Sequence, residues 1–398
     1  MKVDGLRIAL FSGNYNYVKD GANQALNKLV EYLERHGATV RVYSPTSDTP
    51  AFAPAGTLIS VPSISLPRRK EYRLALGLPR HIRDDILAFE PNIFHLSAPD
   101  LLGNRALALA EKMQVPAVAS VHTRFEAYLR YYHLGWLEGA LQVYFRNFYR
   151  RCQQIYAPSD SMAEVLEAER MSDDIRIWGR GIDTEVYTPA RRDLGWRRSL
   201  GIDDGDVVIT FVGRLVLEKG LDVFTDVCRK LEQRNIAHKV LVIGDGPERE
   251  WFGRNLPKAI FTGFLNGENL ARAYASGDVF LNPSQTETFG NVTLEAMASG
   301  LPTVCTQSTG SSSLVVNGET GFLSAPDDLD GMVNNMALLI ESAAMRQEFG
   351  MAARQASLGR GWDQILNSLT QNYLSAIGSA ERKHQVSKRQ RQDYVPGQ

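Results

Sequence analysis

The sequence predicts an α/β fold in which two doubly wound domains, each built on a parallel sheet, follow one another along the chain. Three observations predict it: apolar strand runs alternate with amphipathic helices, the alternation occurs twice, and the strand runs are continuously apolar. Such strands are typical of parallel sheets that helices cover on both faces. The length of 398 residues also exceeds the size at which a single core usually keeps growing.

Both halves of the chain have the same alternation of elements. The strands expected in the first half lie at 6–13, 38–44, 93–97 and 117–122, with a helix at 22–36. The strands expected in the second half lie at 207–213, 239–246, 260–264 and 278–282, with helices at 220–234, 247–255 and 267–276. In open parallel sheets, ligands bind beyond the carboxyl ends of the strands, so we expect the functional residues there.

The same patterns set the expected domain limits. We expect a first domain at 1–185, a second at 186–361, and a helix of clear apolar period at 362–380. The polar stretch 183–206, which contains proline and glycine, joins the two domains. Residues 381–398 are polar and basic, and this composition predicts a disordered tail.

Composition argues against several classes of protein. The formal net charge of −1 gives no general attraction to nucleic acid. Cys152, Cys228 and Cys305 are far apart and odd in number, so we expect neither a disulfide framework nor a zinc site, but three small apolar residues in the core. Neither a signal peptide nor a long apolar span is recognised, which favours a cytoplasmic protein.

The segment from Pro283 to Pro302 contains two carboxylates, Glu287 and Glu295, on either side of a helix start that Gly290 opens. Backbone amides without a partner and the helix dipole both favour a phosphate at such a start. The amides expected there belong to Phe289, Gly290, Asn291 and Val292. Carboxylates bind hydroxyls well, so the segment predicts a ligand with phosphates at its centre and hydroxyls at its ends, such as a nucleotide-diphosphate sugar.

Gly213, Arg214 and Lys219 follow the first strand of the second half. A rigid guanidinium and a mobile ammonium are a suitable pair to neutralise a leaving diphosphate. The alternative for Arg214 and Lys219 is an ordinary surface loop with solvated charges. The alternative for the two glutamates is that Glu287 caps the helix and Glu295 is an exposed helical residue. A metal could also neutralise the diphosphate, but the Asp-x-Asp triplets at 204–206 and 328–330 lie in polar turns, so neither a metal nor a cofactor is expected.

The spacing of Glu287 and Glu295 resembles the Glu-seven-Glu signature of the family-4 retaining glycosyltransferases, which have the GT-B fold. The resemblance covers nearly the whole chain. It rests on FVGRLVLEKG (211–220), VIGDGPER (242–249), FTGF (261–264), NGETGFL (317–323), VHTRFEAYLRYY (121–132) and RGIDTEVYTP (180–189). It is greatest for the branch that passes hexoses from nucleotide sugars to lipids. The resemblance implies two Rossmann-like domains facing a cleft, with the C-terminal helix crossing back to the first.

The resemblance also implies roles for single residues. Glu295 would bind the ribose hydroxyls and Glu287 the hexose near its C3 hydroxyl, neither acting as a nucleophile. His122 would face the donor sugar near its C6 hydroxyl, whereas the residues alone leave it an ordinary, partly buried histidine. Many relatives have two glycines after the first strand, where this chain has Asp20 and Gly21; Gly21 would still let the backbone approach the phosphates. The implied catalytic residues are His122, Glu287, Arg214 and Lys219.

Basic and aromatic residues mix at 67–83 and 124–151, a composition suited to anionic headgroups and the membrane interface. The alternative is a helix that packs its aromatics inward and its arginines outward. The expected partners are a nucleotide-sugar donor, a lipid or lipid-linked acceptor and an anionic membrane surface, without nucleic acid. The expected location is cytoplasmic, at the periphery of the inner face of the cell membrane. The base, hexose, linkage and oligomeric state stay open, with GDP-mannose, UDP-glucose and UDP-glucuronate among the donors that fit.

Three other functions are compatible with parts of the sequence. An enzyme of exopolysaccharide or lipid-linked oligosaccharide assembly would use the same donor site on another acceptor. Nucleotide-sugar epimerases share the GT-B architecture but lack the spacing of Glu287 and Glu295. A nucleotide-sugar-binding protein without activity is the third option, and the presence of Arg214, Lys219 and Glu287 together argues against it. Dependence on an acceptor separates these alternatives.

Overall fold

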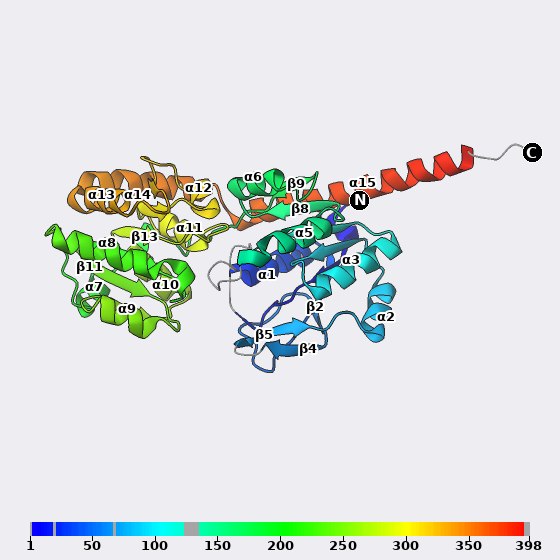
Figure 1. Cartoon of the computed structure of the whole chain (residues 1–398), viewed down its shortest axis with the longest axis horizontal. Helices are drawn as coiled ribbons and strands as arrows, with labels where there is room; N and C mark the ends of the chain where they lie inside the picture. The colour runs from blue at the N-terminus through cyan, green and yellow to red at the C-terminus, as the bar shows by residue number, and fades with distance from the viewer. Residues whose placement is uncertain (1, 19–20, 67–68, 123–134, 394–398) are drawn as a thin grey trace, which may run out of the picture. The chain divides into compact units, whose positions relative to one another are not determined.

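The computed structural model describes residues 2–18, 21–66, 69–122 and 135–393. The chain forms two compact units (Figure 1). Unit 1 consists of Met1–Gly179 and Asp363–Gln398, and unit 2 of Arg180–Trp362. Each unit has its own parallel sheet, so the predicted α/β class with two doubly wound sheets is confirmed.

Unit 1 is built on a seven-stranded sheet in the order β3-β2-β1-β6-β7-β8-β9, with every neighbouring pair parallel. The strands are β1 (Arg7–Phe11), β2 (Thr39–Ser44), β3 (Thr57–Ser60), β6 (Ile93–Leu96), β7 (Ala117–Ser120), β8 (Gln154–Ala157) and β9 (Ile175–Ile177). The helices between them are α1 (Gly21–Arg35), α2 (Arg80–Phe89), α3 (Leu101–Met113), α5 (Glu138–Tyr149) and α6 (Asp160–Ala168), with short 3-10 turns η1 (Val3–Gly5) and η3 (Gly135–Leu137). A separate antiparallel hairpin consists of β4 (Ser63–Leu66) and β5 (Arg69–Ala75).

Unit 2 is built on a six-stranded parallel sheet in the order β12-β11-β10-β13-β14-β15. The strands are β10 (Val208–Val212), β11 (Lys239–Ile243), β12 (Ile260–Gly263), β13 (Val279–Asn282), β14 (Thr303–Thr306) and β15 (Gly321–Ser324). The helices are α7 (Leu194–Ser199), α8 (Leu221–Gln233), α9 (Arg249–Asn255), α10 (Gly267–Ala275), α11 (Asn291–Ala298), α12 (Thr309–Leu314), α13 (Leu329–Glu341) and α14 (Ala343–Leu358), with 3-10 turns η4 (Pro189–Arg191) and η5 (Leu217–Lys219). The strand order reverses between β10 and β13, and such a switch point is where doubly wound sheets bind nucleotides.

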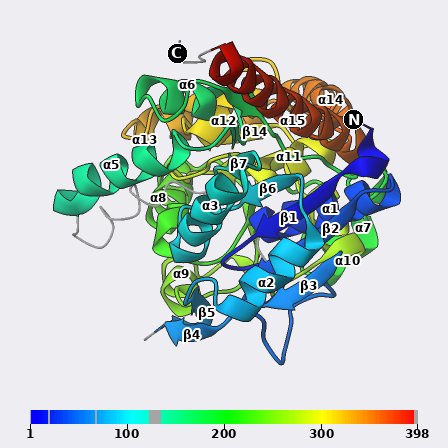
Figure 2. The same ribbon diagram turned by 90° about the vertical axis from the view of Figure 1, so that its right-hand side faces the viewer.

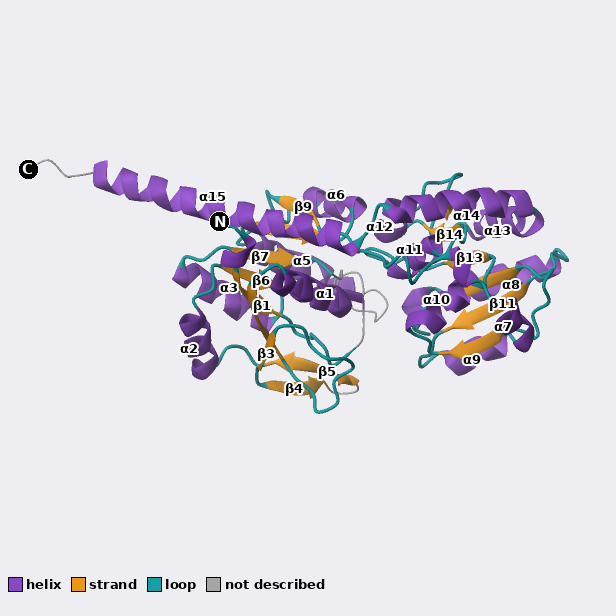
Figure 3. Ribbon diagram, turned by 180° about the vertical axis from the view of Figure 1, so that it is seen from behind, coloured by secondary structure: helices purple, strands orange, loops and turns teal. Residues whose placement is uncertain are grey.

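Helices cover both faces of the sheet in unit 2 (Figure 3). Successive side chains of a strand point to opposite faces, so each strand contributes to two cores. On one face, Val242 and Leu281 pack with α8 and α13. On the other, Leu241 and Phe280 pack with α10 and α11. This arrangement explains why the strand runs are continuously apolar and not alternating.

The long helix α15 (Trp362–Asp393) belongs to unit 1 from Asp363 onward. Its buried residues include Leu366, Leu369 and Tyr373, and its later turns extend beyond the sheet of unit 1 (Figures 1 and 3). The helix continues to Asp393, whereas composition predicted no structure for 381–398. Residues 381–393 contain neither glycine nor proline and are rich in lysine, arginine and glutamine, which favour helix, so helical propensity decides over low hydrophobicity there.

The domain limits also differ slightly from those expected. The first division falls after Gly179, a few residues before the expected limit at 185. The second falls after Trp362, one residue after the expected limit at 361. The cysteines Cys152, Cys228 and Cys305 are buried and unpaired. No helix in the described part of the chain is both long and apolar enough to cross a bilayer.

Candidate active site

The loops that follow β10 and β11 are joined by backbone hydrogen bonds. The Gly213 N–H donates to the Ile243 carbonyl at 3.0 Å, and the Leu215 N–H donates to the Asp245 carbonyl at 3.0 Å. Gly244 has a φ of +139°, and a Cβ at this position would lie 1.9 Å from the Gly213 carbonyl oxygen. Only glycine allows this close approach. The loop after β10 is therefore fixed in position by its neighbour at the carboxyl edge of the sheet.

Lys219 and Glu287, which the sequence suggested separately for phosphate and hexose, are in direct contact. Lys219 Nζ lies 2.6 Å from Glu287 Oε1, and the two side chains are 30% and 12% exposed. The Glu287 backbone is also held, because its carbonyl accepts hydrogen bonds from the Gly310 N–H at 2.8 Å and from Thr309 Oγ1 at 2.9 Å. The carboxylate is thus fixed at both its charged end and its backbone.

The loop between β13 and α11 is tied to η5 by further hydrogen bonds. Ser284 Oγ and Thr286 Oγ1 both donate to the Glu218 carbonyl, at 3.2 and 3.3 Å. Thr306 Oγ1 donates to the Pro283 carbonyl at 3.0 Å. The position of Glu287 therefore depends on small polar side chains whose partners lie in other loops.

Helix α11 begins as the sequence predicted. Gly290 precedes it with a φ of +91°, and as a glycine this N-cap residue has no side chain to cap the first amides. The Thr293 N–H already donates back to the Gly290 carbonyl at 3.0 Å. Phe289 is buried, while Asn291 and Val292 are half-buried. An uncapped helix start of this kind, next to the loop of Glu287, is chemically suited to bind a phosphate.

Glu295 lies on α11, and two tyrosines contact its carboxyl group. Tyr274 Oη donates to Glu295 Oε2 at 2.9 Å, and Tyr187 also hydrogen-bonds this carboxyl. Burial raises the pKa of Glu295 to about 7, and the two tyrosine hydroxyls act in the opposite direction. Glu295 therefore changes charge near neutral pH. Sequence reasoning missed both tyrosines, although Tyr187 lies within the quoted segment 180–189.

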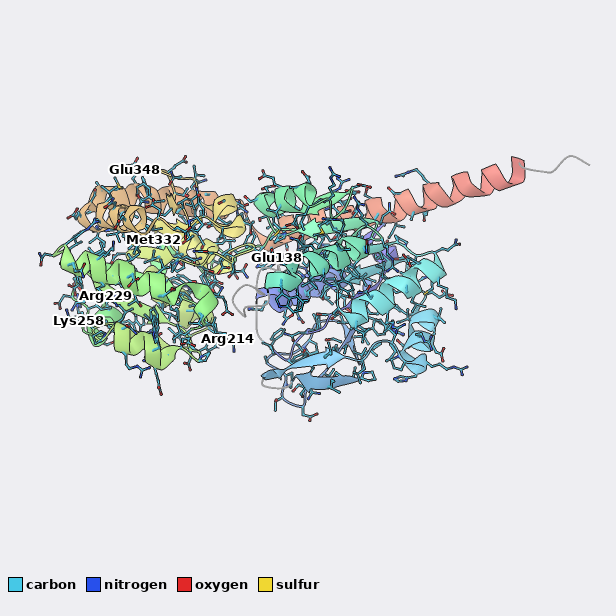
Figure 4. The ribbon with its side chains drawn as sticks, in the orientation of Figure 1. Glu138, Arg214, Arg229, Lys258, Met332 and Glu348 are labelled. Carbon is cyan, nitrogen blue, oxygen red and sulfur yellow. The ribbon has the colours of Figure 1, made fainter. Side chains whose placement is uncertain are left out.

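Arg214 is exposed at the edge of unit 2 where the strands end. Figure 4 shows it at the end of this unit opposite Arg229 and Lys258. Arg229 is in the second half of α8, and Lys258 lies two residues before the first residue of β12, so both mark the amino ends of the strands. The loop of Arg214 is thus on the same edge as the Glu287 loop, as two parallel strands of one sheet require.

In unit 1, His122 lies just beyond the end of β7. Its Nε2 is 2.8 Å from Ser120 Oγ, and its ring packs edge-on against Trp178 with centroids 5.4 Å apart. Gly21 is the first residue of α1 and is partly buried. Asp20, which precedes it, and the segment 123–134 lie outside the described residues, so the structure gives no account of them.

The described part of the second basic and aromatic segment comprises η3 and α5, on the outside of unit 1 (Figure 2). Phe145 and Phe148 are buried, as the packing interpretation predicted. Trp136 is 78% exposed, and Val143 and Tyr144 are also exposed. The packing interpretation thus accounts for the buried side of this described part, and the interfacial interpretation stays a prediction.

The aspartates of the two Asp-x-Asp triplets have structural partners. Asp204 pairs with Arg198 at 2.5 Å, and Asp330 pairs with Lys230 at 2.6 Å. Asp328 caps α13 through the Gly331 N–H. Within the described ranges, no group of three or more His, Cys, Asp and Glu side chains is arranged to hold a metal ion.

Comparisons with known proteins agree on one family. Residues 19–186 match the family described as Glycosyltransferase Family 4, and residues 194–356 match Glycosyl transferases group 1. A sulfoquinovosyl transferase of Arabidopsis thaliana is 33% identical over 96% of this chain and 76% of its own length. A GDP-mannose-dependent alpha-mannosyltransferase of Mycolicibacterium smegmatis is 33% identical over 94% of this chain and 98% of its own.

Two more distant proteins extend this comparison. An alpha-monoglucosyldiacylglycerol synthase of Streptococcus pneumoniae is 25% identical over 75% of this chain and 70% of its own length. Among solved structures, a sucrose-phosphate synthase from Thermosynechococcus elongatus superposes with a TM-score of 0.79 at 19% identity, covering 94% of this chain and all of its own. At this identity the superposition establishes the fold alone.

Proposed function

We propose that this chain, which belongs to the family-4 glycosyltransferases, transfers a hexose from a nucleotide-diphosphate sugar to a membrane lipid or lipid-linked acceptor. The names of the relatives support both halves of the proposal. One relative is named for its dependence on GDP-mannose and another for the synthesis of a glucosylated diacylglycerol. The donor is of the GDP-mannose or UDP-glucose and UDP-glucuronate type.

The observation that carries this proposal is the ion pair of Lys219 and Glu287 beside the uncapped start of α11. In the proposed complex the diphosphate lies against the amides of α11, with Arg214 and Lys219 offering positive charge to it. Glu287 accepts hydrogen bonds from the hexose and Glu295 from the ribose. Each group then binds one part of a single extended ligand.

The proposed reaction retains the configuration of the transferred sugar. The acceptor hydroxyl attacks on the face that the diphosphate leaves, and a phosphate oxygen takes the hydroxyl proton. Glu287 is not the nucleophile in this scheme, because a carboxylate paired with an ammonium at 2.6 Å is better suited to hold a hydroxyl than to attack. Arg214 and Lys219 stabilise the departing charge electrostatically, and transfer is expected to continue in the presence of a chelator.

Release of nucleoside diphosphate from a panel of GDP- and UDP-hexoses, measured with and without a bacterial lipid extract, tests this function. Release that needs both one donor and the lipid is the expected result. Conversion of a donor without any acceptor would instead indicate an epimerase, and transfer only to a preformed lipid-linked glycan would indicate oligosaccharide assembly. Absence of release from every donor would contradict the proposal.

We also propose that the protein binds an anionic membrane surface with the outside of unit 1 and takes its acceptor from that surface. Support comes from Trp136, Val143 and Tyr144, which are exposed on η3 and α5, and from the arginine content of the sequence at 124–151. In a flotation assay, the protein should float with anionic vesicles and should not float with neutral vesicles. Trp136→Ser should weaken binding, whereas Met351→Ser, which removes another exposed apolar side chain from unit 2, should not. Equal flotation with both vesicles would contradict this part.

A further inference from the structure

Arg354 on α14 binds three backbone carbonyls that belong to two separate segments of unit 2. Its Nη1 donates to the Tyr187 and Ala298 carbonyls, both at 2.7 Å, and its Nη2 donates to the Thr184 carbonyl at 2.9 Å. Tyr187 lies 167 positions from Arg354, and Ala298 lies 56 positions from it. One side chain therefore joins the first loop of unit 2 to the end of a helix of the same unit.

The two segments that Arg354 joins carry the two partners of one hydrogen bond at the candidate nucleotide site. Ala298 is the last residue of α11, three residues after Glu295. Tyr187, whose carbonyl Arg354 binds, hydrogen-bonds the Glu295 carboxyl with its hydroxyl. The guanidinium thus fixes the separation of the two backbones whose side chains meet at this hydrogen bond.

The bond to Ala298 also completes the end of α11. The last four carbonyls of a helix have no partner within the helix, and an arginine near them satisfies a carbonyl and interacts favourably with the helix dipole. Ala353, the residue before Arg354, packs in one apolar cluster with Leu294 and Met297 of α11. The packing of α14 on α11 therefore places the guanidinium beside the end of α11.

The loop at 183–187 has a turn of its own, which Asp183 closes. Asp183 Oδ1 accepts the N–H groups of Glu185 and Val186 at 3.0 and 3.1 Å. These bonds fix the shape of the turn, whereas the bonds from Arg354 attach the turn to α11.

Two tyrosine hydroxyls contact the Glu295 carboxyl, and they come from different elements. Tyr274 is on α10, and its Oη lies 2.9 Å from Glu295 Oε2, whereas Tyr187 is in the loop that Arg354 holds. Burial, and after it the charge of Glu295, raises the pKa of both tyrosines, with smaller contributions from Glu287 to Tyr274 and from Asp183 to Tyr187. Both hydroxyls therefore keep their hydrogens, and each stabilises the ionised carboxylate as a donor.

We infer that Arg354 is a positioning residue for nucleotide binding, because it holds the Tyr187 hydroxyl on Glu295 and so favours the charged carboxylate that the ribose needs. The inference rests on the proposed role of Glu295 as the acceptor for the ribose hydroxyls. Among the residues that the structure describes, Arg354 itself binds only backbone carbonyls. Its contribution to nucleotide affinity thus passes through Tyr187 and the charge of Glu295.

Carbon-13 NMR of glutamate-labelled protein without nucleotide tests the inference, because the shift of a carboxyl carbon follows its ionisation. Glu295→Gln identifies the signal, and the wild-type midpoint should lie near pH 7. Arg354→Gln and Tyr187→Phe should each move this midpoint up by about half a pH unit to one pH unit, the value of one hydrogen bond. The double variant should move it no further than Tyr187→Phe alone.

Arg346→Gln is the matched control. Arg346 is on the same helix, and its Nη1 donates to the Leu339 and Ile340 carbonyls, both at 2.7 Å, at the end of α13. This variant should lower stability about as much as Arg354→Gln and leave the Glu295 midpoint unchanged. Tyr274→Phe removes the hydroxyl that Arg354 does not hold, so its shift should add to that of Arg354→Gln.

Nucleotide affinity gives a second readout, measured by calorimetry with GDP or UDP, whichever the wild type binds. Arg354→Gln should bind it about 2- to 5-fold more weakly than the wild type at pH 7. At pH 9 the two proteins should agree within about twofold, because Glu295 is then charged in both. A general loss of structure would weaken binding equally at both pH values and would contradict the inference.

An unchanged Glu295 midpoint in Arg354→Gln would overturn the inference, as would a further shift when Tyr187→Phe is added to it. The same holds if Arg346→Gln moves the midpoint as much as Arg354→Gln, since a general packing effect would then suffice. The NMR titration is recorded without nucleotide, so it stands apart from the proposed function. The expected shifts in a protein that binds neither GDP nor UDP would reject the proposed role of Glu295 and support the positioning of its carboxyl group.

Discussion

The two units hold their candidate site residues in different ways. In unit 2, the partners of Glu287 come from nearby in the chain: Lys219 is 68 positions away, and Thr309 is 22 positions away. In unit 1, Ser120 contacts both His122 and the buried His95, and His95 in turn contacts Tyr373, which is 278 positions away. Two short motifs, one with Lys219 and one with Glu287, therefore contain most of the first arrangement, whereas the second depends on a helix that reaches unit 1 only after the whole of unit 2.

The largest expected effect belongs to Glu287, in the unit where two short motifs supply the two sides of the ion pair. Glu287→Ala should lower kcat by about 10³-fold, because the hexose loses the group that orients it for attack. Steady-state transfer assays measure this loss. Glu348→Ala, on the exposed side of α14 (Figure 4), is the matched control and should transfer at the wild-type rate. Similar rates for both variants would remove Glu287 from the reaction.

Arg214 extends the same comparison to a residue that lies on the same edge of the sheet as the Glu287 loop. Arg214→Ala should lower kcat on the order of 10²–10³-fold, the usual effect of deleting one contact to developing charge. The control is Arg229→Ala, at the opposite end of unit 2, where an exposed pair with Asp226 at 2.7 Å contributes little. An unchanged kcat for Arg214→Ala would mean that this arginine is an ordinary surface residue.

A smaller effect concerns the pH dependence of nucleotide binding. The pKa of Glu295 is raised to about 7, and its charged form accepts the ribose hydroxyls better, so affinity should fall as the pH falls below about 7. Tyr274 Oη opposes this raised pKa, so Tyr274→Phe should move the midpoint to higher pH. Titrations of nucleotide at several pH values measure the midpoint. A midpoint that persists in Glu295→Gln would assign the titration to another group.

The smallest effect concerns stability. A carboxyl group whose pKa is raised by folding destabilises the folded state increasingly as the pH rises from its ordinary value of 4.5 to about 7. Glu295→Gln removes this ionisation. Denaturant unfolding at both pH values measures the midpoint of the variant minus that of the wild type. This difference should be larger, in favour of the variant, at pH 8 than at pH 4.5. A constant difference would show that burial of Glu295 has little electrostatic cost.

The fold was largely predictable, because the strands are continuously apolar and glycine marks several of their ends. The polar stretch 183–206 was not: it contains α7, whose Arg197 is fully buried and paired with Asp278 at 2.9 Å. The sequence alone does not distinguish a buried arginine from an exposed one, and Asp278, the partner of Arg197, lies 81 positions away. The hairpin of β4 and β5 was also missed, since β4 has only four residues and β5 begins with the charged run Arg-Lys-Glu.

The candidate site was predictable where a motif carries the chemistry and not where a partner is distant. Glu287 and Lys219 both stood in short motifs, and their contact follows from the two adjoining strands. Tyr274 is on a helix whose apolar period makes it look like core, which it also is, so its hydroxyl gave no signal. The Ser308 cap that begins α12 could have been found, because serine followed by a polar residue three positions later is typical of a helix start.

The division of work between the two glutamates is the centre of this account, and calorimetric titration of GDP and UDP into three proteins tests it most directly. The proteins are the wild type, Glu287→Ala and Glu295→Ala. With the nucleotide that the wild type binds, Glu295→Ala should weaken binding by about 10- to 100-fold, the value of one charge-assisted contact. Glu287→Ala should bind within about twofold of the wild type, since a nucleotide without sugar does not reach it. The opposite order would contradict the account.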